Sequence, residues 1–317
     1  MIASRISQFI FPFVLLLFIL LLMLQSSTVL AKSFYSPDNP LIIKIMPKHS
    51  QADATHDYQV SLLHLVLNKA KIYHYKIEFS ETFSSQARAM RLLNVSDFID
   101  VVAAAPSIER DAMYHSIKVP LFLGLLGYRV LIIRKDRLAQ FSQLKTAEDL
   151  KNLIACQATH WPDSDILEAN NYHVMRVLNF DSMFSMVLNN RCDYFPRSIT
   201  EGYAEIEAYS KHNNNDELMI FDQVILQYKL PLYFFTQSEN DTLIAILSEG
   251  LNQAVEDGSL IELMKKHSMT KHLFPLSQWQ DKTFFHLSNP FFSTKTPKTN
   301  SNLWINLAPE KHLKNPF

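Results

Sequence analysis

Apolar positions fall along the chain in two recurring patterns, short apolar runs and longer amphipathic stretches. The strongest run covers residues 120–134 (PLFLGLLGYRVLIIR), and a second covers residues 224–236 (VILQYKLPLYFFT). The first run has no helical period and is rich in β-branched and aromatic residues, so it predicts a buried strand at 128–133, entered through Gly124 and Gly127. Two lobes joined by two crossing strands would require two such runs.

The chain before the first run alternates between predicted strands and helices. The strands cover residues 41–46, 73–79 and 98–104. One helix covers about 84–93, and an earlier one begins near Asp57 and places four apolar residues on one face, Tyr58, Leu62, Leu65 and Val66. This βαβαβ order is typical of a parallel sheet flanked by helices.

The same alternation restarts after the first run. Thr146 and Asp149 form a capping pair for a short helix, and Pro162 suits the first turn of another. Predicted strands cover 154–157, 174–178 and 192–195, and predicted helices cover 162–169, 181–189, 200–209, 241–256 and 260–267. We therefore expect lobe 1 to comprise residues 32–124 and 230–273, and lobe 2 residues 125–229.

The first 31 residues predict a targeting segment. Arg5 precedes an uncharged apolar core at 9–24, and small residues follow at 29–31. The core is shorter than the roughly 20 apolar residues of a membrane span. We expect a signal peptide that is cleaved before Lys32 and a protein secreted to the periplasm, with an uncleaved N-terminal anchor as the alternative.

Residues 274–317 lose this order but keep large apolar side chains, which predicts an extended arm packed on the body. The aromatic residues of this segment include Trp279, Phe284, Phe285, Phe291, Phe292 and Trp304.

Composition narrows the function. Of the 317 residues, 48% are hydrophobic and 19% charged, and the net charge is −1, which describes a folded protein without attraction to nucleic acid. Five glycines cannot build a phosphate loop, the 12 histidines are dispersed, and a Gly-x-Ser-x-Gly elbow is absent. We expect no cofactor and no metal site.

The chain has two cysteines, Cys156 and Cys192, in strand-like segments of the same predicted lobe. If those strands are neighbours, a disulfide can form in an oxidising compartment. Two buried free thiols are the alternative, because adjacent parallel strands often hold the sulfur atoms in poor geometry.

Four motifs carry a resemblance to a known family. They are SIER at 107–110 with Pro120-Leu121 after it, LKTAEDLKNL at 144–153, NRCD at 190–193 and EDGS at 256–259. In this order the chain resembles the family-3 extracellular solute-binding proteins over about residues 41–267, and it is similar to an uncharacterised subgroup of that fold. The resemblance implies an α/β, type 2 periplasmic-binding-protein fold. Each of its two lobes is a mostly parallel sheet flanked by helices, and two crossing strands join them.

The resemblance also implies site residues. Arg110 aligns with the family arginine that clamps a ligand carboxylate, and Ser107 lies where a hydroxyl would assist. A surface ion pair of Arg110 with Glu109 or Asp111 is the alternative.

Other candidate residues come from both predicted lobes. The segment from Thr159 opens a helix whose start faces the ligand in the family, where free N–H groups favour an anion. Trp161 is either an aromatic wall of the pocket or core packing, and Tyr58 is either a cleft contact or a core residue.

One departure from the family concerns ligand charge. Where amino-acid binders end a strand of lobe 2 in an aspartate for the ligand's ammonium group, this chain has Arg197 and Ser198. An arginine would repel an ammonium group, so we expect an acidic small molecule held between Arg110 and Arg197.

The leading interpretation is a monomeric periplasmic solute-binding protein, not an enzyme, that serves ABC-type uptake and closes by hinges at 124–128 and 226–231. Two alternatives remain. One is a dehydratase-like enzyme on the same scaffold, with Glu109, Asp163 and Glu201 as the acids to test. The other is a sensor or partner-binding module that uses the aromatic arm as an interface.

Overall fold

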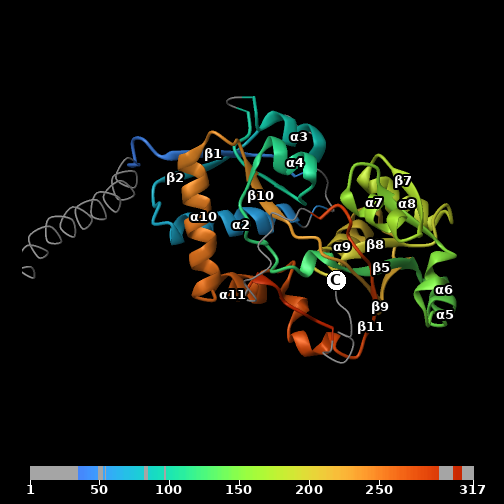
Figure 1. Cartoon of the computed structure of the whole chain (residues 1–317). Coiled ribbons are helices and arrows are strands. Elements are labelled where there is room, and N and C mark those ends of the chain that lie inside the picture. The colour runs from blue at the N-terminus through green and yellow to red at the C-terminus, as the bar shows by residue number, and fades with distance from the viewer. Residues whose placement is uncertain are drawn as a thin grey trace, which may run out of the picture.

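Two units of helices and strands lie side by side and are joined by a pair of crossing segments (Figure 1). The computed structural model describes residues 35–48, 53, 55–81, 85–95, 98–292 and 303–308. The expected signal peptide at 1–31 lies outside these residues. Within the described ranges, no helix is both long and apolar enough to cross a membrane.

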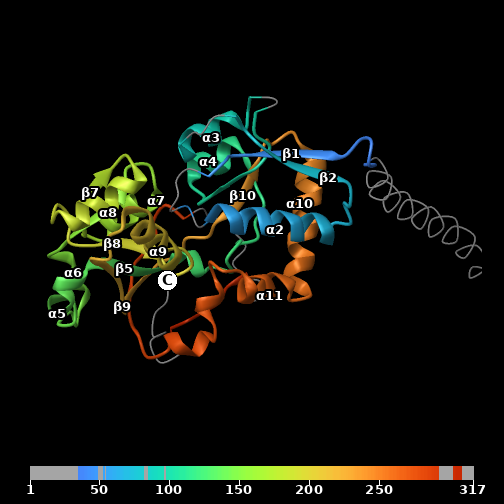
Figure 2. The same ribbon diagram turned by 180° about the vertical axis from the view of Figure 1, so that it is seen from behind.

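Lobe 1 contains the N-terminal elements and the two long helices that follow the second crossing. A parallel pair, β1 and β2, lies beside a three-stranded antiparallel sheet in the order β3-β10-β4. Figure 2 shows α2 running beneath the strands, with its first turn directed toward the other lobe. The elements are β1 (Leu41–Ile45), α2 (Thr55–Lys69), β2 (Tyr75–Phe79), α3 (Gln86–Leu92), β3 (Val102–Ala104), α4 (Ile108–Met113), β4 (His115–Ser116), β10 (Tyr233–Thr236), α10 (Asp241–Glu256) and α11 (Ser259–Lys266).

Lobe 2 is built on a four-stranded sheet in the order β11-β9-β5-β8, with a parallel pair, β6 and β7, beside it. Strand β5 pairs antiparallel with both β8 and β9. The elements are β5 (Tyr128–Arg134), α5 (Leu138–Phe141), α6 (Ala147–Lys151), β6 (Ile154–Ala158), α7 (Pro162–Ala169), β7 (His173–Val177), α8 (Phe180–Leu188), β8 (Phe195–Ser198), α9 (Gly202–Asn213), β9 (Leu218–Gln227) and β11 (Thr283–His286). Short 3-10 turns occupy Leu125–Gly127, Lys135–Arg137, Lys271–Leu273 and Leu276–Trp279.

The second crossing differs from its prediction as one run over 224–236. It consists of two strands, β9 and β10, with residues 228–232 outside any strand between them. Pro231 lies in this break, where a strand hydrogen bond would need the N–H that proline lacks. The break separates the part of the crossing that belongs to lobe 2 from the part that belongs to lobe 1.

One further local prediction needs correction. The strand predicted at 192–195 begins only at Phe195, because the residues before it form a bend that ties the chain to β6. The SIER motif at 107–110 opens α4, because the Ser107 hydroxyl accepts from the amide of Arg110 and caps the helix.

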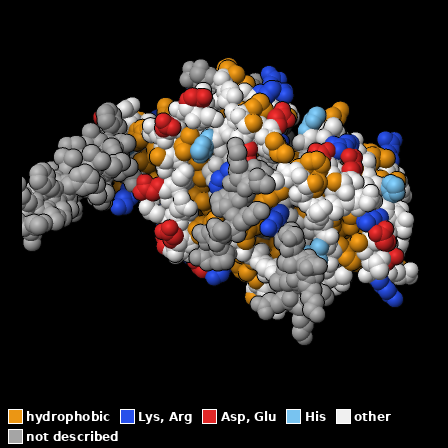
Figure 3. Space-filling view, viewed as in Figure 1, with side chains coloured by type: hydrophobic (Ala, Val, Ile, Leu, Met, Phe, Trp, Pro, Cys, Tyr) orange, Lys and Arg blue, Asp and Glu red, His pale blue; other side chains and the backbone are white. Residues whose placement is uncertain are grey.

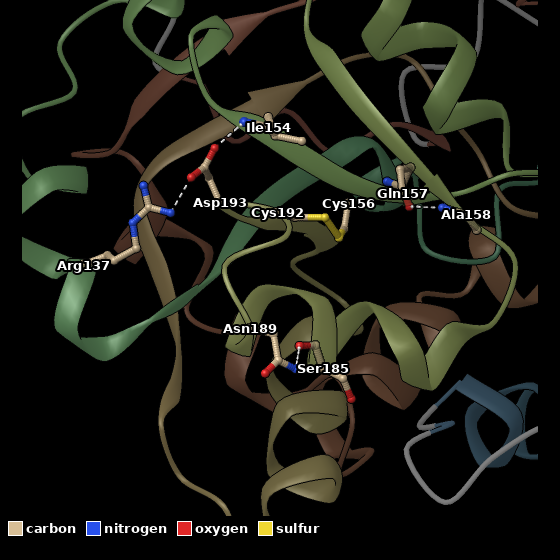
Figure 4. The surroundings of a disulfide bond; sticks show 9 residues. All are labelled: Arg137, Ile154, Cys156, Gln157, Ala158, Ser185, Asn189, Cys192 and Asp193. Carbon is tan, nitrogen blue, oxygen red and sulfur yellow. Dashed lines mark hydrogen bonds and ion pairs between the residues drawn. A yellow bond between two sulfur atoms is a disulfide. The ribbon is translucent and has the colours of Figure 1, made fainter.

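The cysteines form a disulfide that closes this bend on β6 (Figure 4). Cys156 lies on β6 and Cys192 in the loop after α8, with Cα atoms 5.5 Å apart, a separation ordinary for disulfides. Asp193 fixes the loop next to it, since its carboxylate accepts from the amide of Ile154 at 2.6 Å and pairs with Arg137.

The C-terminal segment lies along the two crossings. Strand β11 pairs in parallel with β9, and Trp279, Phe285 and Leu303 are buried against the body. Figure 1 shows this orange-red segment continuing from α11 across the lower side of β9.

Acidic and basic side chains are interspersed over the face seen in Figure 3. This distribution agrees with a net charge of −1 and gives this face no strong field for steering a charged partner.

Candidate functional site

A cavity of about 320 Å³ lies between the two lobes. Lobe 1 contributes residues near β1, β3 and the first turn of α2, and lobe 2 contributes the starts of α7, α8 and α9. The polar and aromatic lining residues include Asp53, Thr55, His56, Gln59, Gln86 and Phe234 from lobe 1, and Trp161, Phe180, Asp181, Arg197, Glu201 and Glu205 from lobe 2.

The described lining carries more negative than positive charge. It includes one guanidinium group and four carboxylates, which belong to Asp53, Asp181, Glu201 and Glu205. Three of them are also strongly buried, because Asp53, Glu201 and Glu205 expose 7% of their surface or less. Burying negative charge is costly unless positive groups or hydrogen-bond donors compensate it.

Arg197 provides part of that compensation from the end of β8. Its guanidinium bonds to both carboxylate oxygens of Glu205, at 2.6 and 2.5 Å, and to Glu201 at 2.9 Å. It also lies over the ring of Trp161 at 4.6 Å. Burial alone would lower the pKa of Arg197, but the two glutamates raise it, so the group stays charged and paired.

The expected acidic ligand stays a prediction, and these ion pairs change the charge that Arg197 presents to any ligand. That expectation required the Arg197 guanidinium to face a ligand as an uncompensated cation. Two glutamates from the start of α9 already neutralise it. They also place negative charge on this wall. The sequence had suggested none there, because Arg197 and Ser198 stand where amino-acid binders have an aspartate.

A second buried arginine extends the network to the crossing segments. Arg129 of β5 is 2% exposed and pairs with Asp163 at 2.6 Å, while Glu201 lies 3.8 Å away. Its Nε donates to the hydroxyl of Tyr228 at 3.0 Å, and that hydroxyl donates to Asp163 at 2.5 Å. Burial would lower the pKa of Arg129, but Asp163 raises it.

The complete network remains net negative. It contains two guanidinium groups, Arg129 and Arg197, and three carboxylates, Asp163, Glu201 and Glu205. Burial raises the pKa of Glu205. The positive charge of Arg197 opposes this shift, whereas the negative charges of Glu201 and Asp53 add to it. A positive ligand group in the cavity would relieve this excess of buried negative charge.

Glu201 also connects the two lobes directly. The hydroxyl of Thr55, the first residue of α2, donates to Glu201 Oε1 at 3.3 Å. Asp53 fixes the same turn of α2, because its Oδ1 accepts from the amides of Thr55 and His56, each at 3.2 Å. The start of α2 therefore holds lobe 1 against the acidic wall of lobe 2.

Arg110 lies behind the lobe 1 wall and does not line the cavity. Its guanidinium donates to the carbonyl oxygen of Ala105 at 2.6 Å and to Oε1 of Gln86 at 3.3 Å, and Gln86 lines the cavity. Burial lowers the pKa of Arg110, and among the described residues no carboxylate forms an ion pair with it. The structure therefore does not bring Arg110 and Arg197 together as a clamp.

The other sequence-predicted site residues divide between the cavity and its surroundings. Trp161 lines the cavity, whereas Ser107 caps α4. Thr159 bonds to the backbone of Val177 at 2.9 Å and lies outside the lining. Ser198 is fully buried beside the first crossing.

Tyr58 belongs to the core of lobe 1. It is fully buried, its hydroxyl donates to the carbonyl oxygen of Leu121 at 3.0 Å, and its ring stacks on Phe122. Of the three acids named for an enzyme, Glu201 lines the cavity, Asp163 pairs with Arg129, and Glu109 is exposed on α4.

Sequence reasoning missed Arg129, Glu205 and Asp53. A signal was present for Arg129, because a charge inside an apolar strand run requires a buried partner. In the part of the chain that the structure describes, no group of three or more histidine, cysteine, aspartate or glutamate side chains is placed to hold a metal ion.

Solved structures with a similar backbone share the two-lobed architecture. An ancestral arginine-binding protein bound to arginine is 18% identical, with 72% of this chain and 98% of that chain covered at a TM-score of 0.51. An ancestral amino acid-binding protein, a precursor of cyclohexadienyl dehydratase, is 16% identical, with 72% and 95% covered at a TM-score of 0.51. A histidine kinase sensor domain with similarity to periplasmic binding proteins is 14% identical, with 72% and 96% covered at a TM-score of 0.51.

These likenesses establish the fold. The chain has the two-lobed, type 2 periplasmic-binding-protein fold, with mixed α/β lobes. No protein-family model matches the sequence, and no curated protein matches it. Each alignment covers almost all of the similar structure but 72% of this chain. More than a quarter of this chain therefore lies outside the shared fold.

Proposed function

We propose that this chain is a periplasmic solute-binding protein that holds a small amino-acid-like ligand between its lobes and delivers it to an ABC-type importer. The ligand carries a carboxylate and at least one positively charged group. The fold supports a binding role, since the similar structures include an amino acid-binding protein and an arginine-binding protein.

The observation that carries the charge assignment is the excess of carboxylates in the cavity. Asp181, Glu201 and Glu205 line the cavity together with one arginine, Arg197, which already pairs with Glu205 and Glu201. An ammonium or guanidinium group of the ligand would restore the balance, with Trp161 and Phe180 as aromatic walls beside it.

The carboxylate would go to the opposite wall. Arg110 is a half-buried cation that donates hydrogen bonds to two neutral groups, the carbonyl oxygen of Ala105 and Oε1 of Gln86. A ligand carboxylate that took the place of Gln86 would give Arg110 an anionic partner and a charge-assisted hydrogen bond. Arg110 is then the carboxylate site that the resemblance implies, reached when Gln86 moves aside.

Export is supported by two independent features. The pattern of the N-terminal segment is typical of a signal peptide, and the Cys156–Cys192 disulfide suits an oxidising compartment.

The ligand class is tested by thermal shift on the mature protein with lysine, arginine, glutamine, glutamate and succinate. A ligand present at 100 times its Kd stabilises the folded state by about 2.7 kcal/mol, which a melting curve resolves easily. We expect lysine or arginine to raise Tm, and glutamate and succinate to leave it unchanged. Stabilisation by succinate or glutamate alone would overturn the charge assignment.

Matched variants test the two walls. Arg110→Gln removes the carboxylate site, and Arg88→Gln is its control, because Arg88 is exposed on the neighbouring helix α3. We expect Arg110→Gln to weaken binding at least about tenfold, since a hydrogen bond to a charged group contributes about 1.5–3 kcal/mol. Equal affinity in both variants would contradict the role of Arg110.

A further inference from the structure

The C-terminal arm, here residues 274–292 and 303–308, contacts both crossing segments where a two-lobed protein must bend. Closure of such a protein changes backbone angles at a few residues of each crossing. The arm is therefore placed to influence closure of the lobes. This effect would be the same whichever ligand the protein binds.

On the second crossing, the arm bonds to the backbone beyond the end of β9. Strand β11 pairs with β9 as far as His286 opposite Gln227. The amide of Leu287 then donates to the carbonyl oxygen of Gln227 at 2.8 Å. The Asn289 side chain donates to the carbonyl oxygen of Lys229 at 2.8 Å, inside the break between β9 and β10.

On the first crossing, a separate stretch of the arm does the same. The amide of Ile305 donates to the carbonyl oxygen of Leu123 at 2.8 Å. The Trp304 ring lies so close to Gly124 that a Cβ there would be 2.5 Å from it. Gly124 has a left-handed backbone angle, φ 79°, so the ring covers a turn whose geometry few other residues could adopt.

Tyr128 joins these two sets of contacts. Its hydroxyl accepts from the Gln227 side chain at 2.9 Å and from the amide of Leu307 at 3.2 Å. One side chain of the first crossing thus bonds to the second crossing and to the arm. Burial raises the pKa of Tyr128 to about 12, so the hydroxyl stays neutral at physiological pH.

The arm also contacts both lobes. Asn170, at the end of α7 in lobe 2, donates to the carbonyl oxygen of Ser288 at 2.8 Å. Leu303 lines a groove with Ser248 and Asn252 of α10 in lobe 1. A change in the angle between the lobes must therefore move the arm or break its bonds.

We infer that the C-terminal arm is a strap that restrains the hinge and so limits how far the lobes open and close. Its bonds use backbone carbonyl groups of Gln227 and Lys229, inside the predicted pivot at 226–231, and of Leu123, next to the predicted pivot at 124–128. Buried Trp279, Phe285 and Leu303 fix the arm to the body, so it cannot detach without exposing apolar surface.

Hydrogen exchange without any ligand tests the strap. Asn289→Ala removes one side-chain bond to the second crossing, and Trp304→Ala uncovers Gly124 on the first. Phe291→Ala is the control, because this arm residue is 40% exposed. In each test variant we expect amides of residues 121–128 and 226–231 to exchange about tenfold faster, with β6 and β7 unchanged.

Two outcomes would overturn the strap. One is unchanged exchange at the pivots in Asn289→Ala, a variant mild enough to fold even if Trp304→Ala does not. The other is an equal acceleration in β6 and β7, which reports general destabilisation. Spin labels at exposed Lys76 and Lys211 add a direct measurement, with a broader distance distribution between the lobes expected in Asn289→Ala than in Phe291→Ala.

Discussion

Gly127 of the first crossing and Tyr228 of the second meet backbone to backbone. The amide of Tyr228 donates to the carbonyl oxygen of Gly127 at 3.0 Å, and a Cβ on Gly127 would lie 1.9 Å from the carbonyl oxygen of Tyr228. A larger residue cannot fit while the crossings keep this approach. The hydroxyl of the same Tyr228 bonds to Arg129 and Asp163, so the contact also positions the buried charge network.

Gly127→Ala is therefore expected to destabilise the protein more than Gly258→Ala. Gly258 has φ 77°, but nothing lies within 4 Å of a Cβ there, so its substitution costs only the backbone strain of about 1–2 kcal/mol. Gly127→Ala must instead push two backbones apart. Urea unfolding of both variants measures the difference in stability. Equal losses of unfolding free energy would show that the two crossings do not approach as closely as this contact requires.

Arg129→Met is expected to lower the free energy of unfolding by about 3–5 kcal/mol, because Asp163 and Glu201 then lose a buried positive partner. Arg134→Met is the control on the same strand, since Arg134 pairs with surface-exposed Asp136 and such pairs contribute about 1 kcal/mol or less. Adding Asp163→Asn to Arg129→Met should cost less than Asp163→Asn alone. Additive losses in denaturant unfolding would argue against the pair.

The disulfide is expected to contribute about 4 kcal/mol to stability, the loop-closure value for its sequence separation of 36 residues. A double variant, Cys156→Ala with Cys192→Ala, should melt at a lower temperature and should not respond to dithiothreitol. The wild type should approach that temperature when reduced. A wild type whose Tm is unaffected by full reduction would contradict this contribution.

The Lys69–Asp257 pair predicts a pH dependence at the contact between α2 and the turn after α10. Hydrogen bonds from Lys69 and Ser259 lower the pKa of Asp257 to about 2. A lowered pKa stabilises the folded state above the unfolded pKa, roughly 3.9, and this stabilisation is lost as pH falls toward about 2.

Asp257→Asn should therefore be less stable than the wild type at pH 7, with the gap closing as pH falls from about 4 to 2. Glu262→Gln is a comparison on α11, where an exposed pair with Lys265 has little effect. A gap that stays constant down to pH 2 would show that Asp257 acts through something other than its charge.

Local sequence signals predicted the bounds of several helices to within a few residues. Helix α7 spans Pro162–Ala169 as predicted, because proline at the first position needs no hydrogen-bond partner. Thr146 and Asp149 form the reciprocal capping box that their spacing indicates. Helix α10 spans Asp241–Glu256, where apolar periodicity and Gly258 mark it.

The candidate site was less accessible to such reasoning. Arg197 and Glu205 lie eight positions apart, one on a strand and the other on the following helix, and they meet only because β8 turns into α9. Arg129 and Asp163 are further apart in sequence and meet where lobe 2 joins the crossings. Pairing decides whether an arginine is available to a ligand, and the sequence does not give that pairing.

The sequence by itself determined the alternation of strands and helices, the two crossing runs and the order of motifs, because these depend on neighbours along the chain. Only the tertiary structure decided which carboxylates surround Arg197, the position of Arg110 behind Gln86 and the position of the arm on the hinge. Those features depend on distances between residues far apart in the chain, and electrostatic and hydrogen-bond energies depend steeply on such distances.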